Sequence, residues 1–120
     1  MRMGLLIVVE SINKKYKIPS ENLFAYIGPS AKKESYVFEY LDKKQFVEED
    51  FYKFISNRQG KFYVDLVGFT SFKLLKCGLK RKNLKVSSID TIKNKNFFSH
   101  SGNIHDNKAV GRNGFIVYLC

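Results

Sequence analysis

Two histidines and an arginine near the C-terminus are the residues of this sequence with the clearest chemical potential. His100 and His105 are its only histidines, and Asp106 and Arg112 follow them in a polar segment. An imidazole pair could bind a metal ion, but a separation of five residues is not the i, i+4 spacing of a helical pair, and no third soft ligand is near. We therefore interpret both histidines as polar loop residues.

The segment around Arg112 could bind an anion instead. It reads Gly111-Arg112-Asn113-Gly114, and backbone amides together with one guanidinium are suitable donors to a phosphate or carboxylate. A turn that precedes a final strand is the alternative interpretation of the same residues.

The two cysteines predict no thiol chemistry. Cys77 and Cys120 allow one disulfide at most and form no CxxC or Cys/His cluster with zinc spacing, so a reduced protein of the cytoplasm is expected. Cys77 follows a predicted helix, where the negative end of the helix dipole disfavours a thiolate. The apolar run 5–9 is too short for a signal peptide or a membrane span, so we expect neither secretion nor membrane insertion.

The first half of the chain is predicted to form a helix, a strand and a less regular region. Leu5, Val9, Ile12 and Tyr16 predict a helix that is apolar nearly all round and needs cover on two sides. The run 23–27 predicts a buried strand that ends at Gly28-Pro29. Residues 36–40 fit a strand or the lead-in to a helix, and a looser helical pattern continues to Ile55.

The second half predicts a strand, a capped helix and two further strands. After a turn over 57–60, the run 61–64 is a short strand. Asp65 is a suitable N-cap for a helix that Gly78 would end in a left-handed conformation. Its buried stripe is predicted to contain Leu66, Phe69, Phe72 and Leu75. Strands are predicted over 84–89 and 114–119, so the order indicates a single α/β (α+β) domain over 1–120 with mixed sheets flanked by helices.

The charge gives only weak information about a partner. The 120 residues have a formal charge of +10, but all but four of the 21 basic residues are lysines, which raises the charge everywhere without building a site. The densest basic run, 73–85, fits a helix C-terminus followed by a solvated turn and lacks interleaved aromatic residues. We therefore do not expect nucleic acid as the partner. Two alternative functions stay open: a small basic RNA-binding domain, and a protein-interaction module that pairs through helix 5–16.

Several motifs, in order along the chain, resemble the C-terminal half of the laccase-domain family, also called polyphenol-oxidase-like. They are Asn22 to Ser30 with its Ile-Gly-Pro-Ser end, Ser35-Tyr36, Lys61 to Leu66, Val86-Ser87, Phe97-Phe98-Ser99-His100 and Gly111-Arg112. The Ile-Gly-Pro-Ser and Phe-Phe-Ser-His motifs in series are the most specific of them.

The resemblance implies a mixed α/β fold and a metal-dependent purine nucleoside phosphorylase. Such enzymes phosphorolyse adenosine, inosine and methylthioadenosine and deaminate adenosine, with zinc or copper held by two histidines and a cysteine. Those ligands lie in upstream segments that no residue here matches, so we expect this chain to bind no metal and to be inactive alone. It would be the product of a truncated gene or one piece of a split enzyme, paired with a complementing N-terminal half or with itself.

Three residues remain as candidates for contact with the nucleoside or phosphate: Ser99, His100 and Arg112. The resemblance also shows departures. Glu34 and Ser35 stand where the family often has cysteines, Asp90 begins a pair that is often Cys-Thr, and Ser101 replaces a common arginine. We predict no catalytic residue and no metal ligand in this chain.

Overall fold

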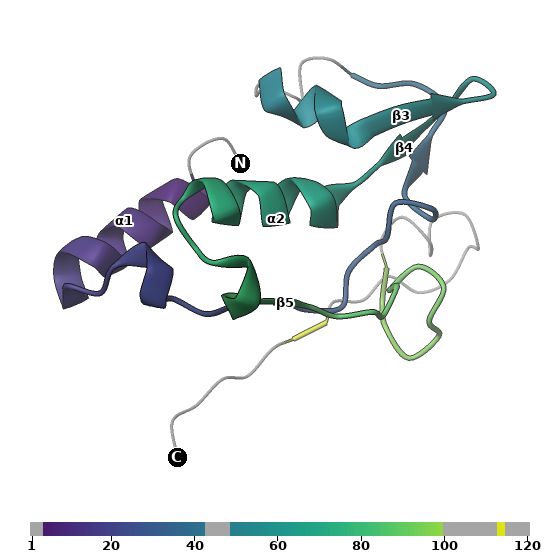
Figure 1. The fold of residues 1–120 in the computed structure, drawn as a ribbon. Coiled ribbons are helices and arrows are strands. Elements are labelled where there is room, and N and C mark those ends of the chain that lie inside the picture. The colour runs from purple at the N-terminus through teal and green to yellow at the C-terminus, as the bar shows by residue number, and fades with distance from the viewer. Residues whose placement is uncertain (1–3, 43–48, 100–112, 115–120) are drawn as a thin grey trace.

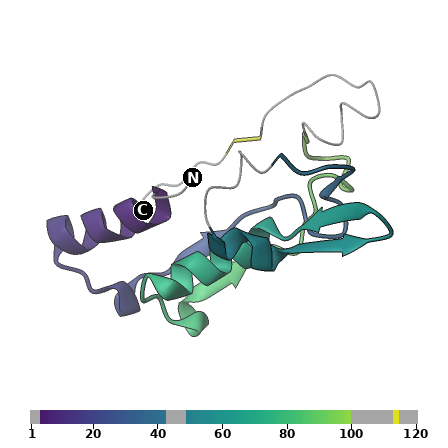
Figure 2. The ribbon, with the colours of Figure 1, turned by 90° about the horizontal axis from the view of Figure 1, so that it is seen from above.

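Two α-helices and two small sheets form the part of the chain that the computed structural model describes, residues 4–42, 49–99 and 113–114. Helix α1 (Gly4–Tyr16) lies at one end, the hairpin of β3 (Ile55–Arg58) and β4 (Lys61–Val64) lies at the other, and α2 (Leu66–Lys76) runs between them (Figures 1 and 2). β1 (Ala25–Ile27) and β5 (Leu84–Val86) form a parallel pair. β2 (Val37–Phe38), β4 (Lys61–Val64) and β3 (Ile55–Arg58) form an antiparallel sheet in that order. Parallel and antiparallel sheets packed with helices confirm the predicted fold class.

Short 3-10 helices complete the described elements. They cover Ser20–Asn22, Glu49–Phe54 and Arg81–Asn83. The first precedes β1, the second leads into β3, and the third leads into β5. None of the helices in these described ranges is long and apolar enough to cross a membrane.

The first hydrophobic cluster joins the two α-helices to the parallel pair. Its buried centre consists of Val9 from α1, Leu74 from α2 and Leu79 just beyond α2. The side chains packed around this centre are half-buried: Leu5, Leu23, Ala25, Ile27, Cys77 and Leu84. Helix α1 therefore covers one face of the parallel pair together with α2.

The second hydrophobic cluster joins α2 to the antiparallel sheet. Its buried centre consists of Phe51, Val64 and Phe69, and the Phe51 and Phe69 rings meet edge to face with centroids 4.8 Å apart. Phe69 is in α2, as is Leu74 of the first cluster. Helix α2 thus contributes one side chain to the centre of each cluster and connects the two sheets.

The start of α2 is fixed as the sequence predicts. Asp65 is the N-cap, and its Oδ1 accepts a hydrogen bond of 2.8 Å from the amide of Gly68. The Asp65 amide donates to the carbonyl of Phe54 at 2.8 Å, so the cap also holds the end of the preceding 3-10 helix. At the other end, Gly78 has φ +100°, as predicted, and Leu79 lies with Leu74 in the buried centre of the first hydrophobic cluster.

Five predictions about individual elements were wrong in part. The strand at 23–27 is not buried on both faces, because Phe24 and Tyr26 are exposed while their neighbours face the core. The helical pattern up to Ile55 fails where β3 begins, since Ile55 pairs with Val64. The turn at 57–60 is shorter than expected, with only Gln59 and Gly60 at positive φ.

The fourth and fifth differences concern α2 and β5. Leu74, not Leu75, is the buried side chain near the end of α2, and Phe72 is only half-buried. The strand predicted over 84–89 ends at Val86. Beyond Val86, backbone groups of Ser87, Ile89 and Thr91 form hydrogen bonds with Ile27 at the end of β1 and with Ser30 in the loop after it. The predicted strand 114–119 lies outside the described residues except for Gly114, which is in no strand.

We predict that removal of the α2 cap weakens the whole fold. Asp65→Ala should lower the free energy of unfolding by about 1 kcal/mol, because the Gly68 amide loses its acceptor. Asp65→Asn should retain most of the stability, since an amide oxygen also accepts at an N-cap. Urea unfolding followed by circular dichroism measures both. An Asp65→Ala variant as stable as the original chain would contradict this role of the cap.

Candidate functional site

The two segments that carry the predicted site residues meet in the structure. The amide of Phe98 donates to Oδ1 of Asn113 at 2.9 Å, and Nδ2 of Asn113 donates to the carbonyl of Phe98 at 2.7 Å. Phe98 precedes the half-buried Ser99, and Asn113 follows Arg112 in the sequence. His100 and Arg112 themselves lie outside the described residues. The pair of hydrogen bonds therefore joins Phe98 of the Phe-Phe-Ser-His motif to Asn113, the residue that follows the Gly-Arg motif in the sequence.

A second set of polar residues lies just beyond the carboxyl ends of β1 and β5. Because these strands are parallel, the loops that follow them leave the sheet at the same edge. The Ser87 amide donates to the carbonyl of Ile27 at 2.8 Å, and Ser30 then exchanges backbone hydrogen bonds with Ile89 and Thr91 at 3.3 and 3.2 Å. The two loops thus stay paired beyond the strands. Ligands in open α/β sheets bind at this kind of edge.

Two side-chain contacts fasten these loops together. Oγ of Ser35 donates to Oδ2 of Asp90 at 2.5 Å, and Nζ of Lys32 donates to the carbonyl of Ser87 at 2.5 Å. Each contact joins positions 55 residues apart. We call Ser30, Lys32, Ser35, Ser87 and Asp90 the loop cluster.

Asp90 is held in its ionised form within the loop cluster. Partial burial acts to raise the pKa of its carboxyl, but hydrogen bonds from the Ser35 hydroxyl and from the backbone amides of Ile92, Lys32 and Lys93 outweigh this effect and lower it. The amide of Ile92 lies 2.9 Å from Oδ1. At neutral pH Asp90 is therefore an anionic hydrogen-bond acceptor within the loop cluster.

Not every polar group of the loop cluster is satisfied. Oγ of Ser30 is buried and has no hydrogen-bond partner among the described residues, whereas Oγ of the buried Ser87 accepts from the amide of Ile89 at 3.2 Å. A buried hydroxyl without a partner costs free energy. The loop cluster combines a lysine, a carboxylate and serine hydroxyls, and these groups can form hydrogen bonds with a polar ligand. None of its five residues is a histidine, so the cluster itself contains no imidazole base that could activate a serine.

The loop cluster was not predicted as a site from the sequence. From the sequence, Ser35 is part of the Ser35-Tyr36 motif and also a departure from the family pattern, and Asp90 is only a departure; the structure shows that the two side chains are hydrogen-bonded to each other. The available signal was a serine-containing loop after each of two predicted strands. Its meaning depends on the parallel pairing of β1 with β5, which the sequence alone does not give.

The described residues do not fit the zinc or copper that the resemblance implies. No group of three or more His, Cys, Asp or Glu side chains within the described ranges is arranged to hold a metal ion. Cys77 is the C-cap of α2, half-buried against the first hydrophobic cluster. We therefore assign no metal-dependent step to these residues.

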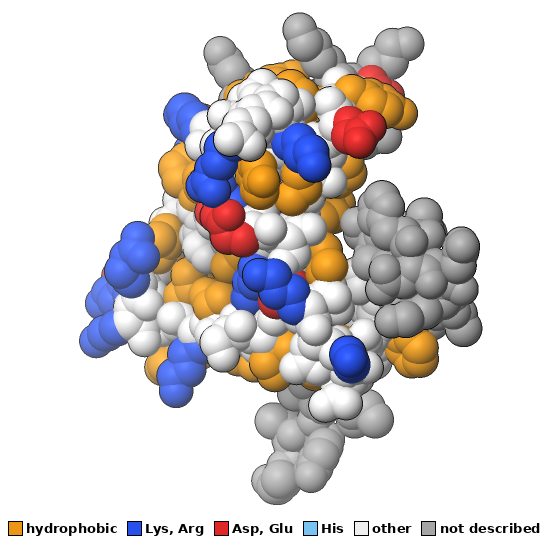
Figure 3. Space-filling view, turned by 90° about the vertical axis from the view of Figure 1, so that its right-hand side faces the viewer, with side chains coloured by type: hydrophobic (Ala, Val, Ile, Leu, Met, Phe, Trp, Pro, Cys, Tyr) orange, Lys and Arg blue, Asp and Glu red, His pale blue; other side chains and the backbone are white. Residues whose placement is uncertain are grey.

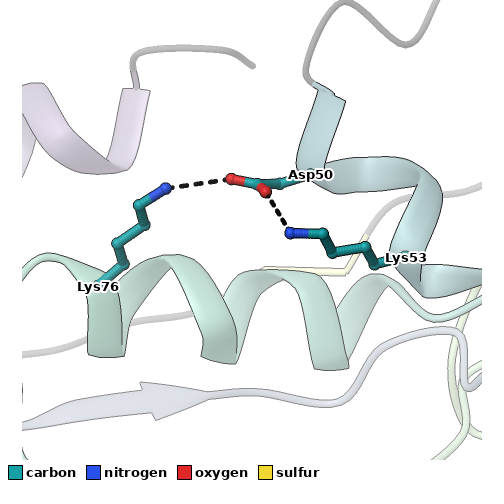
Figure 4. Close-up of polar contacts among 3 residues, drawn as sticks. All are labelled: Asp50, Lys53 and Lys76. Atoms are coloured by element: carbon teal, nitrogen blue, oxygen red, sulfur yellow. Dashed lines mark hydrogen bonds and ion pairs between the residues drawn. The ribbon is translucent and has the colours of Figure 1, made fainter.

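A surface ion-pair group has a structural role. Asp50 contacts Lys53 at 2.8 Å and Lys76 at 3.1 Å, and these hydrogen bonds lower the pKa of its carboxyl to about 2 (Figure 4). Lys76 belongs to α2, so Asp50 joins the 3-10 helix 49–54 to α2.

On the face that Figure 3 draws, the basic side chains of the described residues are spread out rather than concentrated at a site. Figure 3 shows lysines and arginines separated by apolar and neutral groups over one face. Within the basic run 73–85, the ammonium groups of Lys73 and Lys76 lie 5.9 and 5.7 Å from the ring centroids of Phe69 and Phe72. These two lysines cover the aromatic residues of α2.

The family and the fold follow from comparison with known proteins. The family model described as multi-copper polyphenol oxidoreductase laccase matches residues 5–120. The crystal structure of the Bacillus licheniformis hypothetical protein YfiH superposes on 82% of this chain with a TM-score of 0.67 and 19% sequence identity. The chain spans 39% of the length of that YfiH chain. No curated protein matched the sequence.

We predict that Asp90 stabilises the fold in a pH-dependent way. Its pKa is lower in the folded chain than in the unfolded chain, so its contribution is present above about pH 4 and is lost as the pH falls through the folded pKa. Asp90→Asn should lower the free energy of unfolding at pH 7 by about 1–2 kcal/mol. The difference from the original chain should shrink toward pH 2.

Urea unfolding at pH 7, 5, 3 and 2 tests this dependence. Glu10→Gln is the matched control, because Glu10 is exposed on α1 and the variant removes the same charge. A difference between Asp90→Asn and the original chain that stays constant with pH would show that the charge of Asp90 contributes nothing.

Proposed function

Because this chain belongs to the multi-copper polyphenol oxidoreductase laccase family, we propose that it forms one portion of a metal-dependent purine nucleoside phosphorylase of the cytoplasm. The observation that carries the proposal is the family match over residues 5–120, which contains the motif series from Ile-Gly-Pro-Ser to Gly-Arg. Its substrates are adenosine, inosine or methylthioadenosine with phosphate, and adenosine deamination is the second reaction.

We propose that the chain alone does not carry out either reaction. Its whole sequence has two histidines and two cysteines, and none of them stands in a segment that matches the ligand segments of the family. The metal ligands are therefore assigned to the portion of the fold that this chain does not span.

The proposed contribution of this chain is to bind substrate. Ser99, His100 and Arg112 are the proposed contacts to the nucleoside or phosphate, and the hydrogen bonds between Phe98 and Asn113 support a common location for the two motifs. A guanidinium can bind two phosphate oxygens through parallel N–H groups, and a histidine or serine can donate to a third. Such contacts would orient phosphate for attack on the ribose C1′.

The first test of the proposal is an activity assay on the purified 120-residue chain. We expect no release of hypoxanthine from inosine and phosphate, with or without added zinc or copper, and no stoichiometric metal in the protein. Phosphorolysis by the chain alone, together with one bound metal ion per chain, would overturn the proposed division of the site.

The second test examines Arg112 without relying on turnover. Phosphate binding, followed by the ³¹P line width of inorganic phosphate, should weaken about tenfold in Arg112→Gln, as expected for loss of a charge-assisted contact. Arg81→Gln is the control, because Arg81 is an exposed arginine in the 3-10 helix 81–83. Equal binding by the two variants would show that Arg112 is not a phosphate contact.

A further inference from the structure

Asn113 joins two segments of the chain through its side-chain amide. Its Oδ1 accepts a hydrogen bond of 2.9 Å from the backbone amide of Phe98, and its Nδ2 donates to the carbonyl of Phe98 at 2.7 Å. The two residues are 15 positions apart in the sequence. This contact needs an acceptor and a donor on the same side chain, and a carboxamide supplies both.

The residue that follows Asn113 makes this carboxamide chemically labile. Asn113 precedes Gly114, and the dipeptide Asn-Gly occurs once in the 120 residues. An asparagine carboxamide is an electrophile for the backbone nitrogen of the next residue, and a glycine brings that nitrogen close without a Cβ in the way. Both residues are exposed and neither lies in a helix or a strand, so water reaches them and their backbone can rotate without breaking an element.

We propose that Asn113 is a site of spontaneous deamidation, and that the reaction opens the contact with Phe98. The backbone nitrogen of Gly114 forms a bond to Cγ of Asn113, and the Cγ–Nδ2 bond breaks. Nδ2 leaves as ammonia and takes the proton of the Gly114 N–H, which gives a cyclic succinimide. Water then adds to either carbonyl carbon of the ring, which opens to aspartate or isoaspartate. Nothing is oxidised or reduced.

Neither product can form the original pair of hydrogen bonds. In the aspartate product, a carboxylate oxygen replaces Nδ2, so that an acceptor faces the carbonyl of Phe98 where a donor lies 2.7 Å away in the original chain. In the isoaspartate product the main chain runs through Cγ, so the side-chain carboxamide no longer exists. Deamidation therefore removes the contact between the segment that contains Ser99 and the segment that follows Arg112 in the sequence.

Incubation of the purified 120-residue chain in H₂¹⁸O at mildly alkaline pH tests the reaction. Peptide mapping by mass spectrometry should find ¹⁸O at position 113, divided between aspartate and isoaspartate. Asn96 is the matched control in the same sample, because it is exposed outside the helices and strands but is followed by Phe97. We expect position 113 to react at least about tenfold faster than position 96.

Gly114→Ala is the matched variant for the reaction. A Cβ at position 114 meets no atom of the described residues within 4 Å, so alanine fits there without moving a neighbour. Its methyl group hinders the approach of the nitrogen to Cγ of Asn113. We expect deamidation to slow at least about tenfold in this variant, while the hydrogen bonds to Phe98 remain.

Hydrogen exchange at the Phe98 amide measures the consequence. We expect this amide to exchange about tenfold faster in the fully deamidated chain than in the fresh chain, because it loses a hydrogen bond of the folded state. Asn113→Asp, which reproduces one product without incubation, should show the same direction of change. Gly114→Ala incubated for the same time should keep the slow exchange of the fresh chain.

The proposal is overturned by ¹⁸O incorporation at position 113 that is no faster than at position 96, or by equal rates in Gly114→Ala and the original chain. Unchanged exchange at Phe98 after deamidation also overturns it. None of these measurements involves a nucleoside or a metal ion, so their outcome is independent of the proposed function.

Discussion

The rest of this structure depends on α2, which packs into both hydrophobic clusters. Phe69 enters the cluster over the antiparallel sheet, and Leu74 enters the cluster beneath the parallel pair. The helix has only 11 residues, so its own hydrogen bonds would not keep it folded in water. Packing on both sides and the Asp65 cap hold it in place. In turn, α2 fixes where β4, which precedes it, and β5, which follows it, can lie.

Local chemistry made the elements around α2 predictable. A carboxylate before an apolar helical stripe and a glycine after it are signals that act over a few residues, and both Asp65 and Gly78 behave as predicted. β3 was missed for the opposite reason. Ile55 continues the spacing of the preceding phenylalanines, and only the distant pairing with Val64 makes it a strand residue. Tertiary contacts override a weak local pattern in such cases.

The candidate site was only partly predictable from the sequence for the same reason. Sequence motifs predict Ser99, His100 and Arg112 as site residues. The contact between the two segments, however, is made by Asn113, whose side-chain amide forms hydrogen bonds with both the N–H and the carbonyl of Phe98. The loop cluster depends still more on tertiary structure. Ser35 and Asp90 are 55 positions apart and meet because β1 and β5 run in the same direction. No spacing along the chain encodes that direction.

The two clusters are shallow, and this explains why polar contacts between loops matter in this fold. Helix α1 buries Val9 but leaves Ile7 and Val8 about half exposed, so it has cover on one side only although its sequence is apolar nearly all round. The parallel pair likewise buries one face. With one covered face in each layer, apolar burial per residue is limited, and contacts such as Ser35–Asp90 and Lys32–Ser87 contribute a larger share of the stability. A polypeptide that covered either layer would add apolar burial without any change in the existing contacts, because the exposed side chains already point outward.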